Sequence, residues 1–188
     1  MEDKFFSRLL DVIEYDIAPL TEKAVEIGCK VFGAAVILKK DLSLVLPGTN
    51  HEAFSPLWHG EVYTIKLFYE MQGHPDPKDC IFISTHQPCC MCASALAWAG
   101  FGDIWYLFGY EDTGKDFKIP HDQKMIREIF GCAEPKPEND YFKWRSIPEE
   151  IQKLQNSEIF AERLENLKVI YARLSDKYQA GEKRMILK

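Results

Sequence analysis

The sequence lacks any hydrophobic run long enough to cross a membrane. Its longest uninterrupted stretch of apolar residues and glycine is VFGAAVIL, with 8 residues, whereas a transmembrane helix needs about 20. The first residues, MEDKFF, include acidic side chains and contain no basic region followed by an apolar stretch, so no secretory signal is expected. These absences predict a cytoplasmic protein without a membrane partner.

An excess of basic residues is also missing. The chain has 23 Lys and Arg against 29 Asp and Glu, a net charge of −6, and binding to a nucleic-acid backbone draws mainly on clustered Lys and Arg. The only locally basic stretches are KWR at 143–145 and EKRMILK at 182–188, which we interpret as solvated surface. We therefore expect no nucleic-acid partner.

The pattern of apolar residues predicts an α/β protein. Helical spacing covers residues 4–28, where Pro19 kinks the helix or separates two helices. Further helices are expected at 60–72, 92–100 and 123–131, and strands at 31–38, 43–48, 80–84 and 103–110. From residue 148 onward the chain predicts one or two charged helices. Helices alternating with strands imply a layered structure with a mixed sheet.

Three of the six cysteines crowd into the stretch QPCCMC at 87–92, which is compatible with a disulfide, a redox pair or a metal site. A reducing compartment disfavours the disulfide. Cys89 and Cys92 lie three residues apart at the start of a predicted helix, so their side chains share one face, and the helix N-terminus favours their thiolate forms. Cys90 is interpreted as packing on the buried side of this helix, and Cys29, Cys80 and Cys132 as core thiols; these three complete the set of six.

A third ligand is expected from His59, because it alone among the five histidines lies at the start of another predicted helix. Three ligands would leave a tetrahedral Zn²⁺ with one open position, as in catalytic sites. Glu61 lies two residues after His59 and points away from the ligand direction, where it can exchange protons with a water molecule in the open position. A redox pair would leave His59 and Glu61 unexplained.

The motif His59-Gly60-Glu61 followed by Pro88-Cys89-Cys90-Met91-Cys92 fits H-x-E…P-C-x-x-C, the signature of zinc-dependent nucleobase deaminases. The chain resembles the cytidine deaminase-like superfamily and is most similar in motif to its guanine deaminase and tRNA adenosine deaminase branch. The resemblance covers approximately residues 30–130.

This resemblance implies a three-layer α/β/α fold with a mixed central sheet and hydrolytic removal of an exocyclic amine. It implies zinc held by His59, Cys89 and Cys92, with Glu61 as the catalytic residue. Residues 1–147 would form the deaminase domain, and residues 148–188 a C-terminal helical extension packed on it. By analogy with relatives, the protein is expected to be a homodimer.

Five residues are candidate substrate contacts by the same resemblance. Phe32 in FGAAV and Trp98 in ALAWAG match aromatic residues that line the base pocket in guanine deaminases, although aromatic side chains at such positions more often pack in the core. Asn50 matches an asparagine that binds the heterocycle, and it can equally be a turn residue. The amide of Gly60 can bond a substrate carbonyl. Asp122 aligns with an aspartate at the pocket mouth, and its alternative role is a helix N-cap.

Two departures concern the loop before His59. The segment from Asn50 to His59 is two residues shorter than the family pattern, and Leu57 and Trp58 replace small residues there. The resemblance implies that the substrate is a nucleobase or nucleoside, with guanine or a related purine preferred, and these departures indicate that the loop over the substrate is remodelled. A tRNA adenosine, cytidine or deoxycytidylate deaminase is the alternative within this class, and a non-catalytic interaction module with structural zinc is the alternative outside it.

Overall fold

A five-stranded mixed sheet forms the centre of the computed structural model, which describes residues 2–115, 117 and 121–181. The strand order is β2-β1-β3-β4-β5. β1 pairs antiparallel with β2 and β3, whereas β3, β4 and β5 run parallel, which confirms the predicted mixed sheet. The strands are β1 (Gly33–Leu38), β2 (Leu44–Thr49), β3 (Cys80–His86), β4 (Asp103–Phe108) and β5 (Lys143–Ser146).

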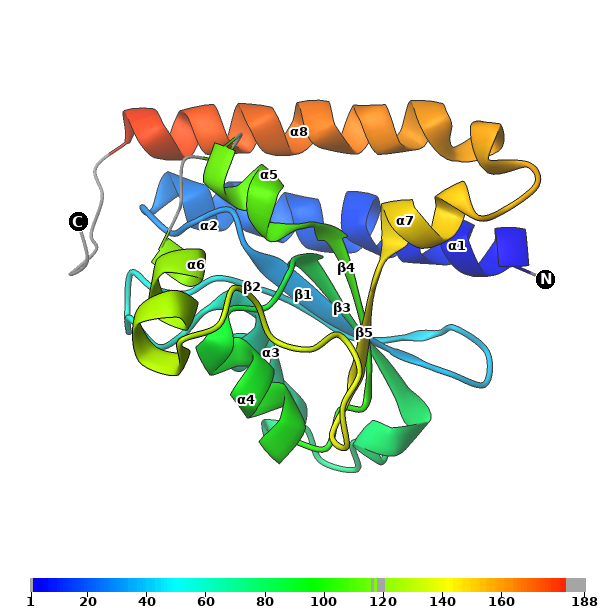
Figure 1. The fold of residues 1–188 in the computed structure, drawn as a ribbon, viewed down its shortest axis with the longest axis horizontal. Coiled ribbons are helices and arrows are strands. Elements are labelled where there is room, and N and C mark those ends of the chain that lie inside the picture. The colour runs from blue at the N-terminus through cyan, green and yellow to red at the C-terminus, as the bar shows by residue number, and fades with distance from the viewer. Residues whose placement is uncertain (1, 116, 118–120, 182–188) are drawn as a thin grey trace.

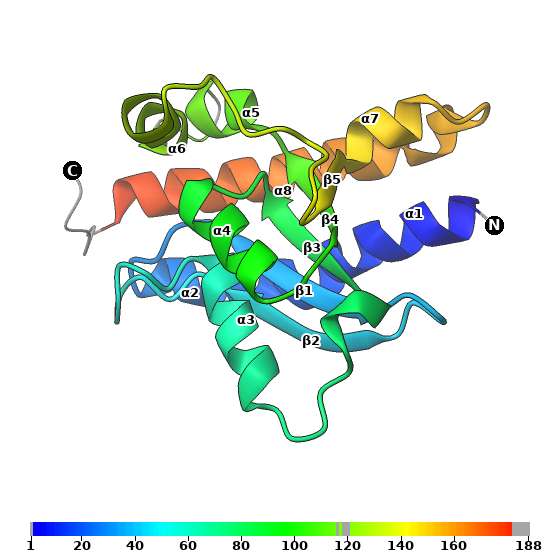
Figure 2. The ribbon, with the colours of Figure 1, turned by 60° about the horizontal axis from the view of Figure 1, so that its bottom comes forward.

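Helices cover both faces of this sheet (Figures 1 and 2). One face carries α1 (Glu2–Asp11), the π-helical η1 (Val12–Ile17), α2 (Ala18–Glu26), α7 (Ile147–Gln152) and α8 (Ala161–Ala180). The other face carries α3 (Gly60–Glu70) and α4 (Cys90–Trp98). The remaining elements are the 3₁₀-helices η2 (Pro77–Asp79) and η4 (Ser157–Phe160), the helices α5 (Tyr110–Lys115) and α6 (His121–Met125), and the π-helical η3 (Ile126–Phe130). No described helix is both long and apolar enough to span a membrane.

The side chains of β1 show why the sheet is buried on both sides. Ala35 and Ile37 belong to the core shared with α1, α2 and α8, whereas Ala34 and Val36 belong to the core shared with α3 and α4. Successive side chains of a strand point to opposite faces, so a continuous apolar run suits a strand that is covered twice. The predicted three-layer α/β/α fold is confirmed.

The terminal helices pack on each other across the same face of the sheet. The predicted N-terminal helix is interrupted by η1 just before Pro19, which lies in the first turn of α2, where its missing N–H breaks no intrahelical bond. On α8, Leu167, Tyr171 and Leu174 are buried in the core cluster of α1 and α2. Residues at both ends of the chain therefore share one core.

The structure corrects several surface and core predictions. The KWR segment is not solvated surface, because it forms β5, with Trp144 only 3% exposed and Arg145 donating to Asp103 at 2.8 Å. The basic stretch at 182–188 lies outside the described residues. Cys29 and Cys80 are core thiols as predicted, but Cys132 is exposed. Cys90 is half-buried and lines a pocket on the outer side of α4.

Candidate metal centre and active site

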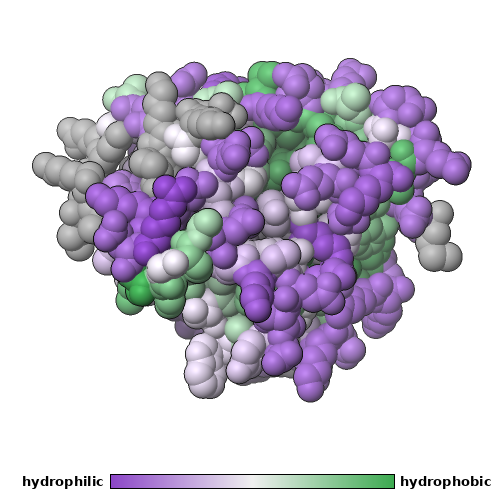
Figure 3. Space-filling view, in the orientation of Figure 1, coloured by the Kyte–Doolittle hydropathy of each residue, from purple (hydrophilic) through white to green (hydrophobic). Residues whose placement is uncertain are grey.

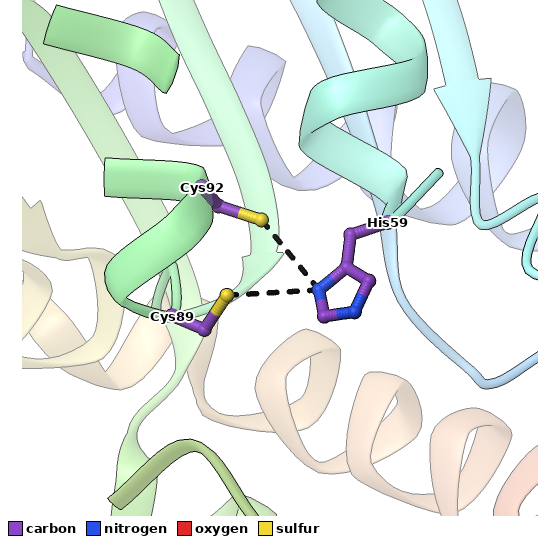
Figure 4. A group of neighbouring side chains, drawn as sticks. All are labelled: His59, Cys89 and Cys92. Atoms are coloured by element: carbon purple, nitrogen blue, oxygen red, sulfur yellow. Dashed lines mark hydrogen bonds between the residues drawn. The ribbon is translucent and has the colours of Figure 1, made fainter. Parts of the chain in front are cut away.

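Two helices begin at the same point beside the sheet and bring the predicted ligands together. His59 precedes α3 and Cys89 precedes α4, both with extended backbone, and Cys92 lies in the first turn of α4. Figure 4 shows the imidazole of His59 pointing at both cysteine side chains. His59 Nδ1 lies 3.6 Å from Cys89 Sγ and 3.7 Å from Cys92 Sγ. The predicted convergence of two helix starts is therefore seen directly.

This donor set fits a zinc ion. Among the described residues, His59, Cys89 and Cys92 form the one group of three metal-binding side chains whose ligand atoms all lie within 4.8 Å of one another. Tetrahedral zinc with ordinary Zn–N and Zn–S bonds places an imidazole nitrogen and a thiolate roughly 3.5 Å apart, close to the two observed separations. One nitrogen and two sulfurs are also the ligand types that zinc prefers over magnesium or calcium.

The two cysteines have different proton affinities. The hydrogen bond from Cys92 lowers the pKa of Cys89 well below its ordinary value, burial opposes this shift, and His59 adds to it. Burial and the neighbouring negative charge of Cys89 keep the pKa of Cys92 high. Burial also opposes protonation of His59, but its hydrogen bonds to Cys89 and to Glu52 raise its pKa to about 10. A positive charge is therefore favoured where these three side chains meet, as expected for a cation site.

Glu61 lies beside this group without belonging to it. Its side chain is buried, with the residue 4% exposed, and its Oε2 accepts a hydrogen bond from Cys92 Sγ at 3.3 Å. Its Oε1 lies 3.1 Å from Ser84 Oγ, whose hydroxyl also donates to the carbonyl of His86 at 2.6 Å. Burial and the charge of Cys89 raise the pKa of Glu61. A carboxyl group held in this way can both accept and return a proton.

Comparison with protein families agrees with this geometry. Residues 16–108 match the family described as the cytidine and deoxycytidylate deaminase zinc-binding region. Residues 16–108 therefore belong to this zinc-binding deaminase family. This region spans α2 to β4 and includes the two helix starts described above.

Known relatives support the same assignment. The chain is 30% identical over 86 residues to guanine deaminase of Bacillus subtilis, a match that covers 45% of this chain and about half of the relative, at 54%. Among solved structures, guanine deaminase from Nitrosomonas europaea is similar with a TM-score of 0.52 and 18% identity, covering 88% of this chain and 81% of the other. The Bacillus subtilis guanine deaminase structure gives 0.52 and 22%, covering 86% and 96%. These structures share the deaminase fold.

The deaminase region also contains a buried ion pair that the sequence analysis did not identify. Glu52 Oε1 accepts hydrogen bonds from Lys30 Nζ at 2.9 Å and from His59 Nε2 at 3.2 Å. Burial opposes ionisation of Glu52, but His59 and Lys30 together lower its pKa. The partners are 22 and 7 positions away from Glu52 along the chain, so no local pattern marks them.

The turn into α4 is held by two further residues. Gln87 accepts a hydrogen bond from the backbone N–H of Tyr110 at 3.2 Å, and the Tyr110 hydroxyl donates to the carbonyl of Pro88 at 2.6 Å. The backbone N–H of Gln87 donates to Phe108 at 2.8 Å. These bonds fix the segment that delivers Cys89 to the site.

Gly60 is required by the close approach of α3 to β1. A Cβ atom at this position would lie 2.8 Å from the carbonyl oxygen of Phe32 and 3.0 Å from the backbone of Gly33. Real Cβ atoms essentially never come within 3.0 Å of such neighbours, so a larger residue would push the start of α3, and His59 with it, away from the sheet. This explains why the motif has glycine between His59 and Glu61.

Phe32 and Asn50, two of the predicted substrate contacts, lie close to this glycine through the carbonyl of Phe32. The backbone N–H of Asn50 donates to the carbonyl of Phe32 at 2.7 Å, and Asn50 Oδ1 accepts from the backbone N–H of Glu52 at 3.0 Å. Asn50 is thus a turn residue, but its Nδ2 is buried without a hydrogen-bond partner among the described residues. The Phe32 ring is 5% exposed and packs edge-on against His86. The side-chain amide nitrogen of Asn50 is therefore a buried donor group without a partner in the described part of the chain.

The other two predicted contacts differ from each other. Burial, followed by the charge of Cys89, raises the pKa of Asp122 to about 7, with Glu61 contributing in the same direction. The negative charges of Cys89 and Glu61 therefore act on Asp122. Asp122 occupies the first turn of α6 after His121, not the N-cap position. Trp98 ends α4 and is 92% exposed. The structure does not bring Trp98 to the other candidate residues within this chain.

Proposed function

We propose that the protein is a zinc-dependent hydrolytic deaminase that removes an exocyclic amine from a nucleobase or nucleoside, with guanine or a related purine as its substrate. The observation that carries this proposal is the buried carboxyl group of Glu61, placed beside the His59, Cys89 and Cys92 group but outside it. A purely structural zinc site has no use for such a group. The guanine deaminase relative supports the choice of a purine.

Zinc bound by His59, Cys89 and Cys92 would lower the pKa of a water molecule to about 7. Glu61 then takes a proton from the attacking water and delivers it to the ring nitrogen next to the reacting carbon. A second proton passes through Glu61 to the amine, the carbon–nitrogen bond breaks, and ammonia leaves as the carbon–oxygen bond becomes a carbonyl. Ser84 keeps the carboxyl group in place through its contact with Oε1.

The substrate would lie over the ring of Phe32, within reach of polar side chains and a backbone amide. Asn50 Nδ2 would donate to an acceptor on the ring, and the backbone amide of Gly60 would bond a carbonyl. Asp122 would accept from a ring N–H at the open side of the pocket. This set can hold a purine that presents both donors and acceptors.

Ammonia release from a substrate panel tests the proposal. The zinc-loaded protein is expected to release ammonia from guanine faster than from adenine, cytosine, cytidine or deoxycytidylate. Turnover of adenosine in tRNA, together with tRNA binding at physiological salt, would show instead that the protein is a tRNA adenosine deaminase. Stoichiometric zinc without turnover of any substrate would favour the non-catalytic module.

We also propose that the enzyme is a homodimer acting on small molecules, with residues 148–188, of which the structure describes those up to 181, as a C-terminal extension packed on the deaminase domain. The outer side of α4 supports this assembly. A pocket of about 630 Å³ lies there, and Trp98, Phe130 and Tyr141 line it while each remains mostly exposed. Green and white side chains gather over α4 and α6 at the lower left of Figure 3. Sedimentation of wild-type protein and of Trp98→Glu would show a dimer for the first and a shift toward monomer for the second.

We further propose that the protein works in the cytoplasm. All six of its cysteines are free, and closely spaced thiols stay reduced in that compartment. Fractionation of cells that express the protein, followed by immunodetection, would find it in the cytosolic fraction. Recovery in a secreted or membrane fraction would refute the proposal.

A further inference from the structure

Glu52 contacts the side of His59 that faces away from the two cysteines. Its Oε1 atom lies 3.2 Å from His59 Nε2, while Nδ1 of the same ring faces Cys89 and Cys92. An imidazole that donates from one nitrogen keeps its lone pair on the other. A hydrogen bond from Nε2 to Glu52 therefore fixes the tautomer and the ring orientation that a metal ligand needs.

Glu52 is itself held in place by its backbone and by its side chain. Its backbone N–H donates to Asn50 Oδ1 at 3.0 Å, and its Oε1 accepts from Lys30 Nζ at 2.9 Å. The side chains of Lys30 and Glu52 are only 7% and 5% exposed. A buried carboxylate without a partner is costly, so Lys30 is what permits a charged acceptor behind His59.

The arrangement is not that of an ordinary stabilising ion pair. Replacing a buried pair by apolar residues is often neutral for stability, so the pair is weak support for a purely structural role. Carboxylates that accept from the second nitrogen of a ligating histidine commonly raise metal affinity 10- to 100-fold. The remaining oxygen of Glu52, Oε2, has no hydrogen-bond partner among the described residues. The carboxylate therefore contacts both Lys30 and His59 through Oε1.

We propose that Glu52 is a positioning residue for His59 and that Lys30 supplies the charge that keeps Glu52 in this role. The proposal rests on the proposed zinc centre. It assigns to the shortened loop before His59 a function in metal binding, in addition to any contact with substrate.

Two double variants test this proposal without leaving a buried charge unpaired. Lys30→Met with Glu52→Leu removes both charges and the acceptor for His59 Nε2. Lys30→Met with Glu52→Gln removes the same charges but keeps an acceptor of nearly the same shape. The two proteins differ only in the group that faces His59. Glu70→Gln, which breaks the exposed Lys66–Glu70 pair on α3, is the control for charge removal nearby.

Zinc affinity is measured by competition with a chelator, and the geometry of the centre by the visible absorption of the Co²⁺-substituted proteins. The double variant with Glu52→Leu is expected to bind zinc 10- to 100-fold more weakly than wild type and to show an altered Co²⁺ spectrum. The double variant with Glu52→Gln should recover most of the affinity and the wild-type spectrum. Glu70→Gln should match wild type in both measurements.

Equal zinc affinity and equal Co²⁺ spectra in the wild type and both double variants would overturn the positioning role. Thermal unfolding of the metal-free proteins separates folding from metal binding, because a loss of affinity in a protein with wild-type Tm cannot come from unfolding. Wild-type protein that binds no zinc would refute the proposed function itself, together with the role of Glu52. The two failures are therefore distinguishable.

Discussion

Burial of His86 at the end of β3 should make stability depend on pH. Its ring packs against Phe32, Phe108 and Tyr171, with centroids 4.7, 5.0 and 5.8 Å away. Nδ1 lies 2.9 Å from Thr85 Oγ1, while Nε2 is buried without a partner among the described residues. Burial therefore lowers the pKa of His86 to about 3.

Because burial lowers the pKa of His86, the folded protein should lose stability as the pH falls. Since the folded pKa of His86 lies below the unfolded value near 6.5, the unfolded chain binds more protons between about pH 6.5 and pH 3. The contribution of neutral, buried His86 to the free energy of unfolding is complete above about pH 6.5 and is lost as the pH falls. Each pH unit within this window costs about 1.4 kcal/mol, so acidification from pH 6.5 to 4.5 should remove about 2 to 3 kcal/mol through this residue.

His86→Phe tests the reasoning, because phenylalanine suits the surrounding aromatic cluster and does not titrate. Denaturant unfolding of the metal-free, reduced protein at several pH values between 7.5 and 4.5 gives the free energy of unfolding. The difference between wild type and variant should change by about 2 to 3 kcal/mol across that range. Phe108→Leu, in the same cluster, should lower stability equally at every pH. Parallel curves for wild type and His86→Phe would refute the account.

Three other predictions concern packing and reactivity. Gly60→Ala should destabilise the protein by about 1 to 3 kcal/mol in denaturant unfolding and weaken zinc binding, because the new Cβ meets the carbonyl of Phe32. Unchanged stability and zinc affinity would contradict the close approach of α3 and β1. Arg163→Met should cost about 1 kcal/mol of unfolding free energy, since its guanidinium bridges α8 to Asp11 at 2.8 Å, and a wild-type midpoint would show that this contact contributes nothing. Cys132 is exposed, so Cys132→Ser should remove the fastest phase of thiol labelling in the zinc-loaded protein; an unchanged fast phase would place the reactive thiol elsewhere.

The grouping of the candidate metal ligands could be predicted because its signal is local. Cys89 and Cys92 share a face of one helix start, and His59 begins another, so two short motifs define the group once a layered α/β fold is assumed. The strands that position these helices were also predictable, because β1 and the first four residues of β3 are apolar runs buried on both faces.

Errors arose where local pattern carries little information. α4 has small or apolar residues on every side, so its sequence does not show which face meets the sheet. Cys90 is only half-buried and not in the core as predicted, and Trp98 lies on the outer side of the helix, away from the other candidate residues. β5 is only 4 residues long, too short for alternation to be recognised against its basic residues. The Lys30–Glu52 pair depends on how the loop before His59 folds back, which no local spacing encodes.

Ammonia release from guanine by zinc-loaded wild type and by Glu61→Gln tests whether this carboxyl group is the proton carrier of a deaminase. Both proteins should bind one zinc ion per chain and have the same thermal stability. The wild type should turn over, and the variant should be slower by at least about 100-fold, because an amide cannot carry the proton from water to the ring nitrogen and the leaving amine. Wild-type turnover by Glu61→Gln would contradict the role assigned to this carboxyl group.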